Sequence, residues 1–178
     1  MSAGSTPVIG ANVDLVTDGT TTDGENAQFL LGTETLLDGN VYRYVQAGEA
    51  ISTTLNEPYA LSITSAGQAV KLTAALGLTA KFIGFAPRQI IADNSFFWAR
   101  MRGVFPIRVS ASAAADARLG IGGVGASGRL ASSVTASAGN LIVLGVQITA
   151  VASASASAGN TIRTAVATWP LGETAAAD

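Results

Sequence analysis

Residues Lys81–Ala111, KFIGFAPRQIIADNSFFWARMRGVFPIRVSA, carry the strongest structural signal in the chain and hold five of the six phenylalanines. Asn and Asp tolerate the positive φ angles of a tight hairpin, so Asp93-Asn94 predicts a two-residue turn between two strands. The register that follows from such a turn places Ala86 opposite Met101. The stretch therefore predicts a β-hairpin at the centre of the fold.

The second strand of this hairpin separates two kinds of side chain by the period-two rule. One side carries the mostly apolar set Phe97, Ala99, Met101, Gly103, Phe105, Ile107 and Val109. The opposite side carries Trp98, Arg100, Arg102 and Arg108. The first set is expected to face the core, and the second to form an exposed basic stripe that begins with an aromatic ring. Pro87 and Pro106 lack a backbone donor and indicate an edge or a bulge.

The composition is typical of a single domain of 178 residues that covers much of its surface with other chains. Only 12% of the residues are charged and 48% are hydrophobic, so few charges remain for a solvent-exposed surface. No apolar run approaches the ~20 residues of a membrane helix, and we expect no membrane partner. The N-terminal sequence shows no signal-peptide pattern.

Charge is segregated along the chain. Residues 1–60 carry eight acidic residues and one arginine, and residues 71–130 carry eight basic and two acidic residues. The two parts have net charges of −7 and +6, and the whole chain has −2. They are expected either to compensate each other within one fold or to attract each other between copies.

The rest of the chain reads as arm, domain and tail. Residues 1–26 have little hydrophobic pattern and predict an extended arm, residues 27–172 a β-rich domain, and residues 173–178 a tail. Segment 67–80 fits a short helix or a strand followed by a loop equally well. With eight to ten expected strands, the fold class is all-β, a single β-barrel or β-sandwich-like domain with little helix.

Turn signals locate further strands. Asp38-Gly39-Asn40 predicts a turn before a strand over 41–45. In the last third, SAGNLI at 137–142 recurs as SAGNTI at 157–162, and the two copies predict neighbouring strands of one antiparallel sheet. Pro170 and Gly172 are expected to end the last strand.

Nothing in the residue types recommends an enzyme. The chain contains no His and no Cys, which removes the usual general base and the commonest metal ligands. Asp93 and Asp116, the acids of the basic part, fit turns or caps. Gly120, Gly122 and Gly125 match G-x-G-x-x-G by letter without the context of a dinucleotide site. We therefore expect no catalytic residue, no cofactor and no metal site.

Nucleic-acid binding is also not expected. Phe96 and Trp98 beside the arginines resemble a stacking platform, but the sequence pI is about 5.0. The arginines fit pairs with carboxylates better, on this chain or on a neighbour, because a guanidinium binds a carboxylate through two parallel hydrogen bonds.

The order of motifs resembles one family. The motifs are Gly39–Ala47, Phe82–Ala86, Ala92–Trp98, Arg102–Val104, Ala114–Leu119, Gly128–Leu130 and Trp169-Pro170. In this order they resemble the capsid decoration, or cement, proteins of tailed bacteriophages. The resemblance implies a β-rich protein on the outer surface of an icosahedral head. The chain differs from that pattern in its long acidic arm and its Ala/Ser-rich insert.

On this resemblance we expect a structural virion protein that binds the major capsid protein on the outside of the capsid and stabilises the head. We expect it also to bind itself, as a trimer rather than a dimer. Trp98, Arg100, Arg102 and Arg108 are the predicted partner interface, and residues 1–26 a strap across a neighbour. The alternative is a carbohydrate-binding β-module on the virion surface, in which exposed Trp98, Tyr42 and Tyr44 stack on sugars.

Overall fold

The computed structural model describes residues 11–17, 27–52, 58–110, 119–121, 128–131, 141–149 and 160–174. These residues form nine strands and one six-residue helix, which confirms the all-β prediction. The strands are β1 (Glu34–Leu37), β2 (Asn40–Ala47), β3 (Ala60–Ile63), β4 (Gln68–Lys71), β5 (Phe82–Phe85), β6 (Phe96–Ser110), β7 (Leu119–Ile121), β8 (Leu141–Ile148) and β9 (Asn160–Thr174), and the helix is α1 (Ala74–Thr79).

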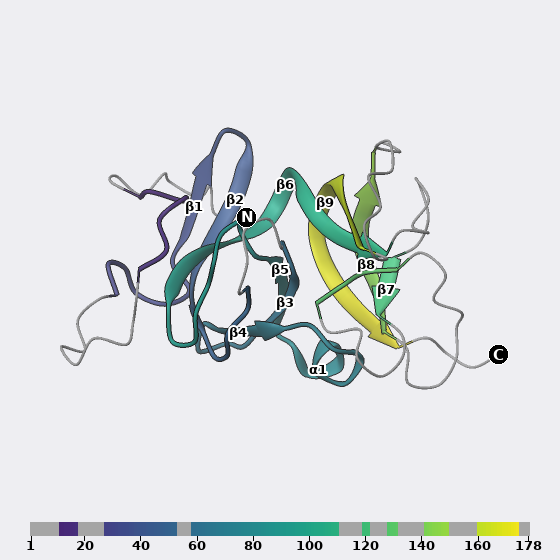
Figure 1. The fold of residues 1–178 in the computed structure, drawn as a ribbon, viewed down its shortest axis with the longest axis horizontal. Coiled ribbons are helices and arrows are strands. Elements are labelled where there is room, and N and C mark those ends of the chain that lie inside the picture. The colour runs from purple at the N-terminus through teal and green to yellow at the C-terminus, as the bar shows by residue number, and fades with distance from the viewer. Residues whose placement is uncertain are drawn as a thin grey trace, which may run out of the picture.

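Five strands close into a barrel. The sheet order is β1-β2-β4-β3-β5-β6-β9-β8-β7, and an additional pairing of β2 with β6 joins β2, β4, β3, β5 and β6 in a ring. β2 and β4 run parallel. β6 is long enough to leave the barrel and continue into a second region with β9, β8 and β7, so it connects the left and right parts of Figure 1.

The hairpin between β1 and β2 forms as the sequence predicts. Asp38 and Gly39 both have positive φ, 49° and 78°, as a two-residue turn of the hairpin type requires. Along β2, Val41 and Val45 belong to the barrel core, and Tyr42 and Tyr44 belong to a separate aromatic cluster on the other side. This division is the one expected from strand alternation.

The tight hairpin predicted at Asp93-Asn94 is wrong, although the chain does turn there. Asn94 has φ 62°, but β5 and β6 pair at Phe85 opposite Arg100, two residues away from the predicted register. The cause is a competing segment, because Ile91 pairs with Ser52 and the turn hydrogen-bonds to Ala47. Residues 86–95 therefore form a loop fastened to residues 47–52.

The apolar side chains on this side of β6 are buried from Phe97 to Val109, as predicted, but they enter two cores. Phe97, Ala99 and Met101 lie in a core enclosed by the barrel strands. Phe105, Ile107 and Val109 lie in a second core, between the β3–β5 wall of the barrel and strands β7, β8 and β9. A Cβ on Gly84 would lie 2.8 Å from Ile63 and 3.0 Å from Met101, so the barrel interior is filled by side chains.

The repeated segments lead into β8 and β9, which are antiparallel neighbours, as predicted. The expectation that Pro170 and Gly172 end the last strand is wrong, because β9 continues to Thr174. The ladder between β8 and β9 shifts register between Leu144 and Val146, whose partners are Leu171 and Ala167. Pro170 falls inside this irregularity, where the missing donor costs no ladder hydrogen bond.

Segment 67–80 contains both structures that its pattern left open. β4 (Gln68–Lys71) comes first, and α1 follows with Thr73 as N-cap, whose hydroxyl accepts a hydrogen bond from the Leu76 amide at 3.2 Å. β9 also includes Glu173 and Thr174, which the sequence assigned to the tail.

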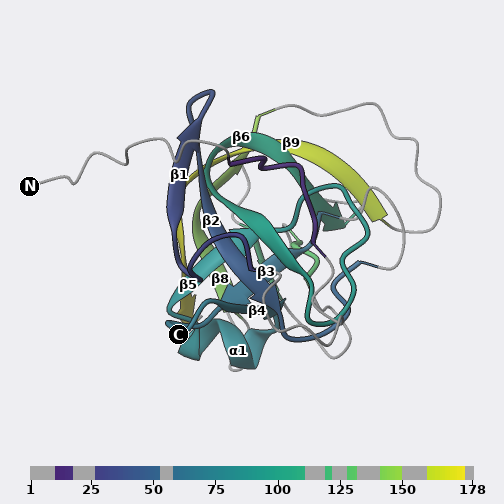
Figure 2. The same cartoon turned by 90° about the vertical axis from the view of Figure 1, so that its left-hand side faces the viewer.

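The described part of the predicted arm, residues 11–17, packs on the barrel. Thr17 and Phe96 exchange two backbone hydrogen bonds of 2.8 Å, and Val13 is buried with the aromatic residues of β2 and β6. Figure 2 shows this segment in purple, close to β1, β2 and β6. Residues 1–10 and 18–26 lie outside the described residues, as do Asp116, Gly122 and Gly125.

Candidate interaction surfaces

Trp98 is buried, so the prediction that it begins an exposed stripe is wrong. Its side chain is only 1% exposed and packs in a cluster with Val13, Tyr42 and Tyr44. Phe29 covers this cluster, with ring centroids 5.2 Å from Trp98 and 5.3 Å from Tyr44. Two segments from the first thirty residues therefore cover a barrel face that alternation alone would leave to solvent.

The same N-terminal segments also bury the aromatic residues that were predicted to stack on sugars. Tyr42 and Tyr44 are buried with Trp98, and the Tyr44 hydroxyl accepts a hydrogen bond from the Gln28 amide at 3.2 Å. Burial raises the pKa of both tyrosine hydroxyls, and the charge of Asp14 and Asp38 raises that of Tyr42 further, against the opposing effect of Arg100. These three rings do not form an exposed stacking surface.

The three arginines of the predicted interface lie in different surroundings. Arg102 is exposed and lies between Val41 of β2 and Thr168 of β9. Arg100 is half-buried opposite Tyr42, with its guanidinium carbon 6.0 Å from the centre of the Phe105 ring. Its Nε is buried without a hydrogen-bond partner among the described residues. The role of these arginines in binding a partner stays a prediction.

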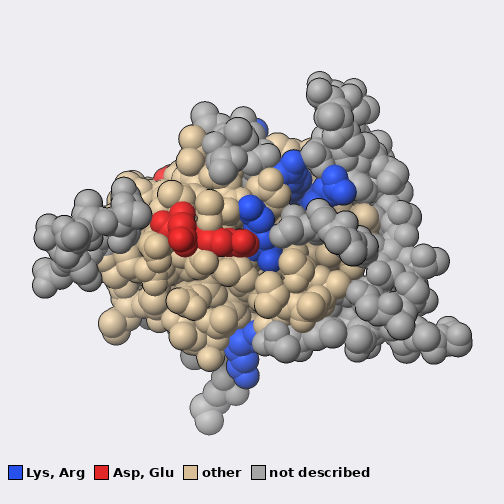
Figure 3. All heavy atoms as spheres, turned by 60° about the horizontal axis from the view of Figure 1, so that its bottom comes forward, with Lys and Arg blue, Asp and Glu red and all other residues tan. Residues whose placement is uncertain are grey.

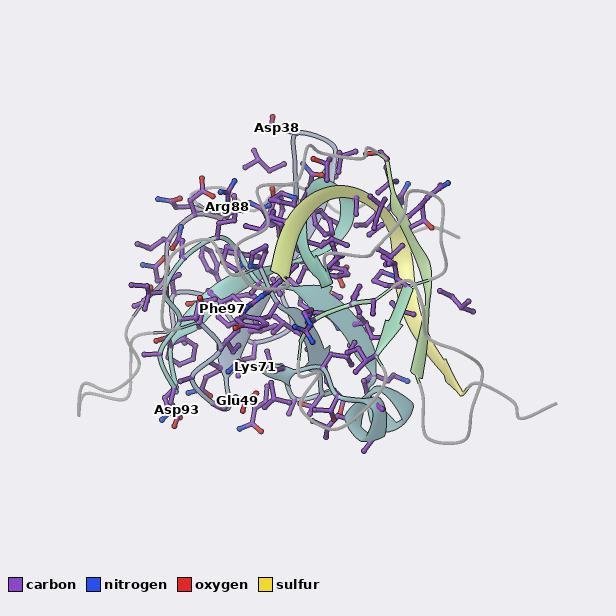
Figure 4. All side chains as sticks on the ribbon, turned by 45° about the vertical axis from the view of Figure 1, so that its right-hand side comes forward. Asp38, Glu49, Lys71, Arg88, Asp93 and Phe97 are labelled. Carbon is purple, nitrogen blue, oxygen red and sulfur yellow. The ribbon has the colours of Figure 1, made fainter. Side chains whose placement is uncertain are left out.

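Arg108 belongs to a second group of charges, centred on Tyr59. The Arg108 guanidinium carbon lies 4.5 Å from the centre of the Tyr59 ring, and Lys71 Nζ lies 5.3 Å from it. Glu49 Oε1 accepts a hydrogen bond of 2.7 Å from the Lys71 amide, and Figure 4 shows Glu49 beside Lys71, at the end of the molecule away from Asp38. Figure 3 shows basic and acidic side chains meeting on the underside of the molecule.

The backbone explains why this group is fixed. A Cβ on Gly128 would lie 2.6 Å from Cδ1 of Tyr59, so the main chain at Gly128 lies directly against the ring. Gly128 also donates to Leu72 O and accepts from the Ala60 amide. The predicted stripe is therefore distributed over two regions, Arg102 on one and Arg108 on the other.

Arg43 was not predicted as a special residue, and its environment is unusual. It lies on the Val41–Val45 side of β2, forms a 3.3 Å ion pair with Glu34, and stacks its guanidinium 3.6 Å from the centre of the Phe82 ring. Burial lowers its pKa, and Glu34 opposes that effect. The sequence contained the signal, because a cation lies on an otherwise apolar strand side.

Exposed leucines form the second feature that sequence reasoning missed. Residues 30–37 read LLGTETLL, and all four leucines are exposed, with Leu30 at 85%. This segment holds β1, which is the last strand of the sheet at that end. The visible signal was four leucines within eight residues. We call residues 30–37 the leucine edge.

Two further properties bear on the candidate sites. In the described parts of the chain, no group of three or more acidic residues is placed to hold a metal ion. No helix among those residues has the length and apolar character needed to cross a membrane.

Comparison of the chain with models of protein families, with curated proteins and with solved structures finds no match. The candidate sites therefore rest on the residues and their geometry.

Proposed function

We propose that this protein is a structural virion component, a decoration protein that binds the outer surface of a capsid built from a major capsid protein, stabilises the head and associates with itself. The order of motifs from Gly39 to Pro170, which resembles the decoration proteins of tailed phages, supports the choice of partner. This structural role requires only that the protein bind to the capsid, and it involves no catalysis.

The observation that carries the proposal is a surface on which large apolar side chains are exposed while charges are few. Among the described residues, nine large hydrophobic side chains are exposed, Leu15, Leu30, Leu31, Leu36, Leu37, Leu76, Ile90, Val104 and Leu144. Only 12% of all residues are charged. Full burial of one leucine side chain contributes about 1.5–3 kcal/mol, so contacts by several of them give measurable adhesion.

A repeating shell strengthens such contacts. When one copy is bound, its surfaces reach neighbouring copies and capsid subunits at high effective concentration, so weak contacts add up to stable attachment. A filled barrel interior suits this role, because a rigid body loses little conformational freedom on binding. Links between adjacent capsomers then resist the outward pressure of a packaged genome.

The test is binding to purified heads that lack any decoration protein. We expect the wild-type chain to sediment with the heads at a fixed number of copies per head and to raise the temperature at which they rupture. Glycan binding by the isolated chain with no sedimentation on heads would overturn the proposal in favour of the carbohydrate-binding alternative.

The predicted arginine interface is tested in the same assay. Arg102→Ser is expected to weaken binding about tenfold or more, because Arg102 is exposed and charged pairs at interfaces contribute on the order of 1–3 kcal/mol. Arg88→Ser, an equally simple loss of an exposed arginine in the loop before β6, is the matched control. Equal occupancy for both variants removes Arg102 from the interface.

A further inference from the structure

The leucine edge combines a strand at the end of a sheet with exposed apolar side chains. Among the described residues, β1 pairs with β2 and is the outermost strand of the nine-stranded sheet. Leu36 and Leu37 are 40% and 42% exposed. A strand edge presents backbone donors and acceptors that another strand can complete.

Proteins usually protect such edges by several devices, and among the described residues β1 shows only one of them, its length of four residues. The other common devices against unwanted strand pairing include lysine, proline and β-bulges. Residues 30–37 contain neither lysine nor proline, and β1 pairs with β2 in continuous register from Glu34 to Leu37. An apolar edge without lysine, proline or a bulge favours a strand that is paired in the working assembly.

Charge narrows the choice of partner. The leucine edge carries one ionisable side chain, Glu34, and Arg43 of the same copy neutralises it through the 3.3 Å ion pair. A charged side chain on a partner strand would therefore have no unpaired opposite charge on the leucine edge to bind. A matching partner is uncharged, apolar and short, since β1 has four residues, or about 13 Å of strand.

We propose that the leucine edge of one copy pairs with the leucine edge of a second copy, antiparallel and about a two-fold axis. The segment meets each requirement for its own partner, namely neutrality, leucines and equal length. A surface that pairs with itself is related by a two-fold axis, and antiparallel pairing places the exposed Asp38 carboxylates at opposite ends of the contact. The barrel sheets of the two copies become one continuous sheet.

This inference rests on the self-association in the proposed function but not on capsid binding. It gives the pairwise contact two-fold symmetry, in place of the trimer expected from the sequence. The two proposals are tested separately, since self-association is measured on the free chain and capsid binding on heads.

The first experiment measures the mass of the free chain by sedimentation over a range of concentrations. We expect the wild type to form dimers and Leu36→Lys to raise the dissociation constant about 100-fold, because each lysine costs roughly tenfold and the symmetric contact contains two. Leu144→Lys is the matched control, because Leu144 is 41% exposed on β8, which pairs with β7 and β9. Leu37→Lys is a second edge variant in case the first fails to fold.

The second experiment uses the absence of cysteine in the chain. Under mild oxidation, Leu36→Cys or Leu37→Cys is expected to give a disulfide-linked dimer. For Leu144→Cys, the yield of this dimer is expected to stay at the level produced by random collision. Either a monomeric wild type at all concentrations, or dimers that survive both lysine variants, overturns the inference. A monomeric chain whose Leu36→Lys variant no longer binds heads also overturns it, since the edge then contacts the capsid, and the proposed function stands.

Discussion

Because Trp98 is buried, we expect its removal to lower the free energy of unfolding by a large amount. Trp98 is 1% exposed and lies 5.1 Å from Tyr44 and 5.2 Å from Phe29, measured between ring centroids. Replacing a buried tryptophan by alanine costs about 3–5 kcal/mol, from lost burial and the cavity left behind. Each aromatic pair contributes about 0.5–1.5 kcal/mol of its own, so the upper half of that range is expected here.

The assay is urea unfolding of Trp98→Ala followed by circular dichroism. A domain of this size has a stability of about 5–15 kcal/mol, so the variant still folds. With a slope of roughly 2 kcal/mol per molar urea, a loss of about 4–5 kcal/mol lowers the midpoint by about 2–2.5 M. Trp98→Phe keeps a ring against Phe29 and is expected to lose clearly less.

Leu30→Ala is the control for a surface substitution. Leu30 is 85% exposed, and at a protein concentration low enough to keep the chain monomeric, changes at such positions usually alter the stability by less than about 0.5 kcal/mol. If Trp98→Ala shifts the midpoint no more than Leu30→Ala does, the aromatic cluster is not covered by the N-terminal segments. The interpretation of Trp98 as an exposed interface residue then returns.

Two further predictions concern the backbone and the tyrosines. Gly39→Ala is expected to cost about 1–2 kcal/mol from positive φ alone, because no atom lies within 4 Å of the added Cβ. Gly103→Ala is expected to cost more in the same unfolding assay, since its Cβ would lie 1.9 Å from Asn40 Oδ1 at φ 122°. Equal losses would contradict this. Burial raises the pKa of Tyr42 and Tyr44, so the folded state keeps protons that the unfolded chain releases near pH 10, and stability falls as the pH rises above about 10. Replacing both with Phe should flatten that fall in unfolding curves measured from pH 8 to 11, and an unchanged pH dependence would contradict the assignment.

Local sequence signals identified the elements well. Asp38-Gly39 specified its turn because both residues accept positive φ, a requirement that needs no distant partner. Alternation along β6 identified the buried apolar side chains of the set from Phe97 to Val109, although it missed Trp98 on the other side, because a strand directs successive side chains to opposite faces. The repeated segments correctly predicted the neighbours β8 and β9.

The pairing of strands and the exposure of their faces could not be predicted from these local signals. The hairpin at Asn94 was expected to be tight, but Ser52 competes for Ile91, and local turn chemistry contains no information about that segment. The exposed side of β2 and β6 was expected to be free, but Val13 and Phe29 cover it from elsewhere in the chain. Because such long-range contacts are not visible in the sequence, the predicted stripe from Trp98 to Arg108 proved to be divided between separate regions of the structure. The leucine edge was missed for the same reason.

The positions of most strands, their apolar sides and the turns could be predicted from the amino-acid sequence, because they follow from backbone sterics and side-chain polarity within a few residues. The covered face, the strand at the edge of the sheet and the arginine that reaches solvent are properties of the folded chain alone. Those outcomes depend on contacts between segments far apart in the chain, such as Phe29 with Trp98 and Arg43 with Phe82, and the free energy of such a contact exists only once both segments are in place.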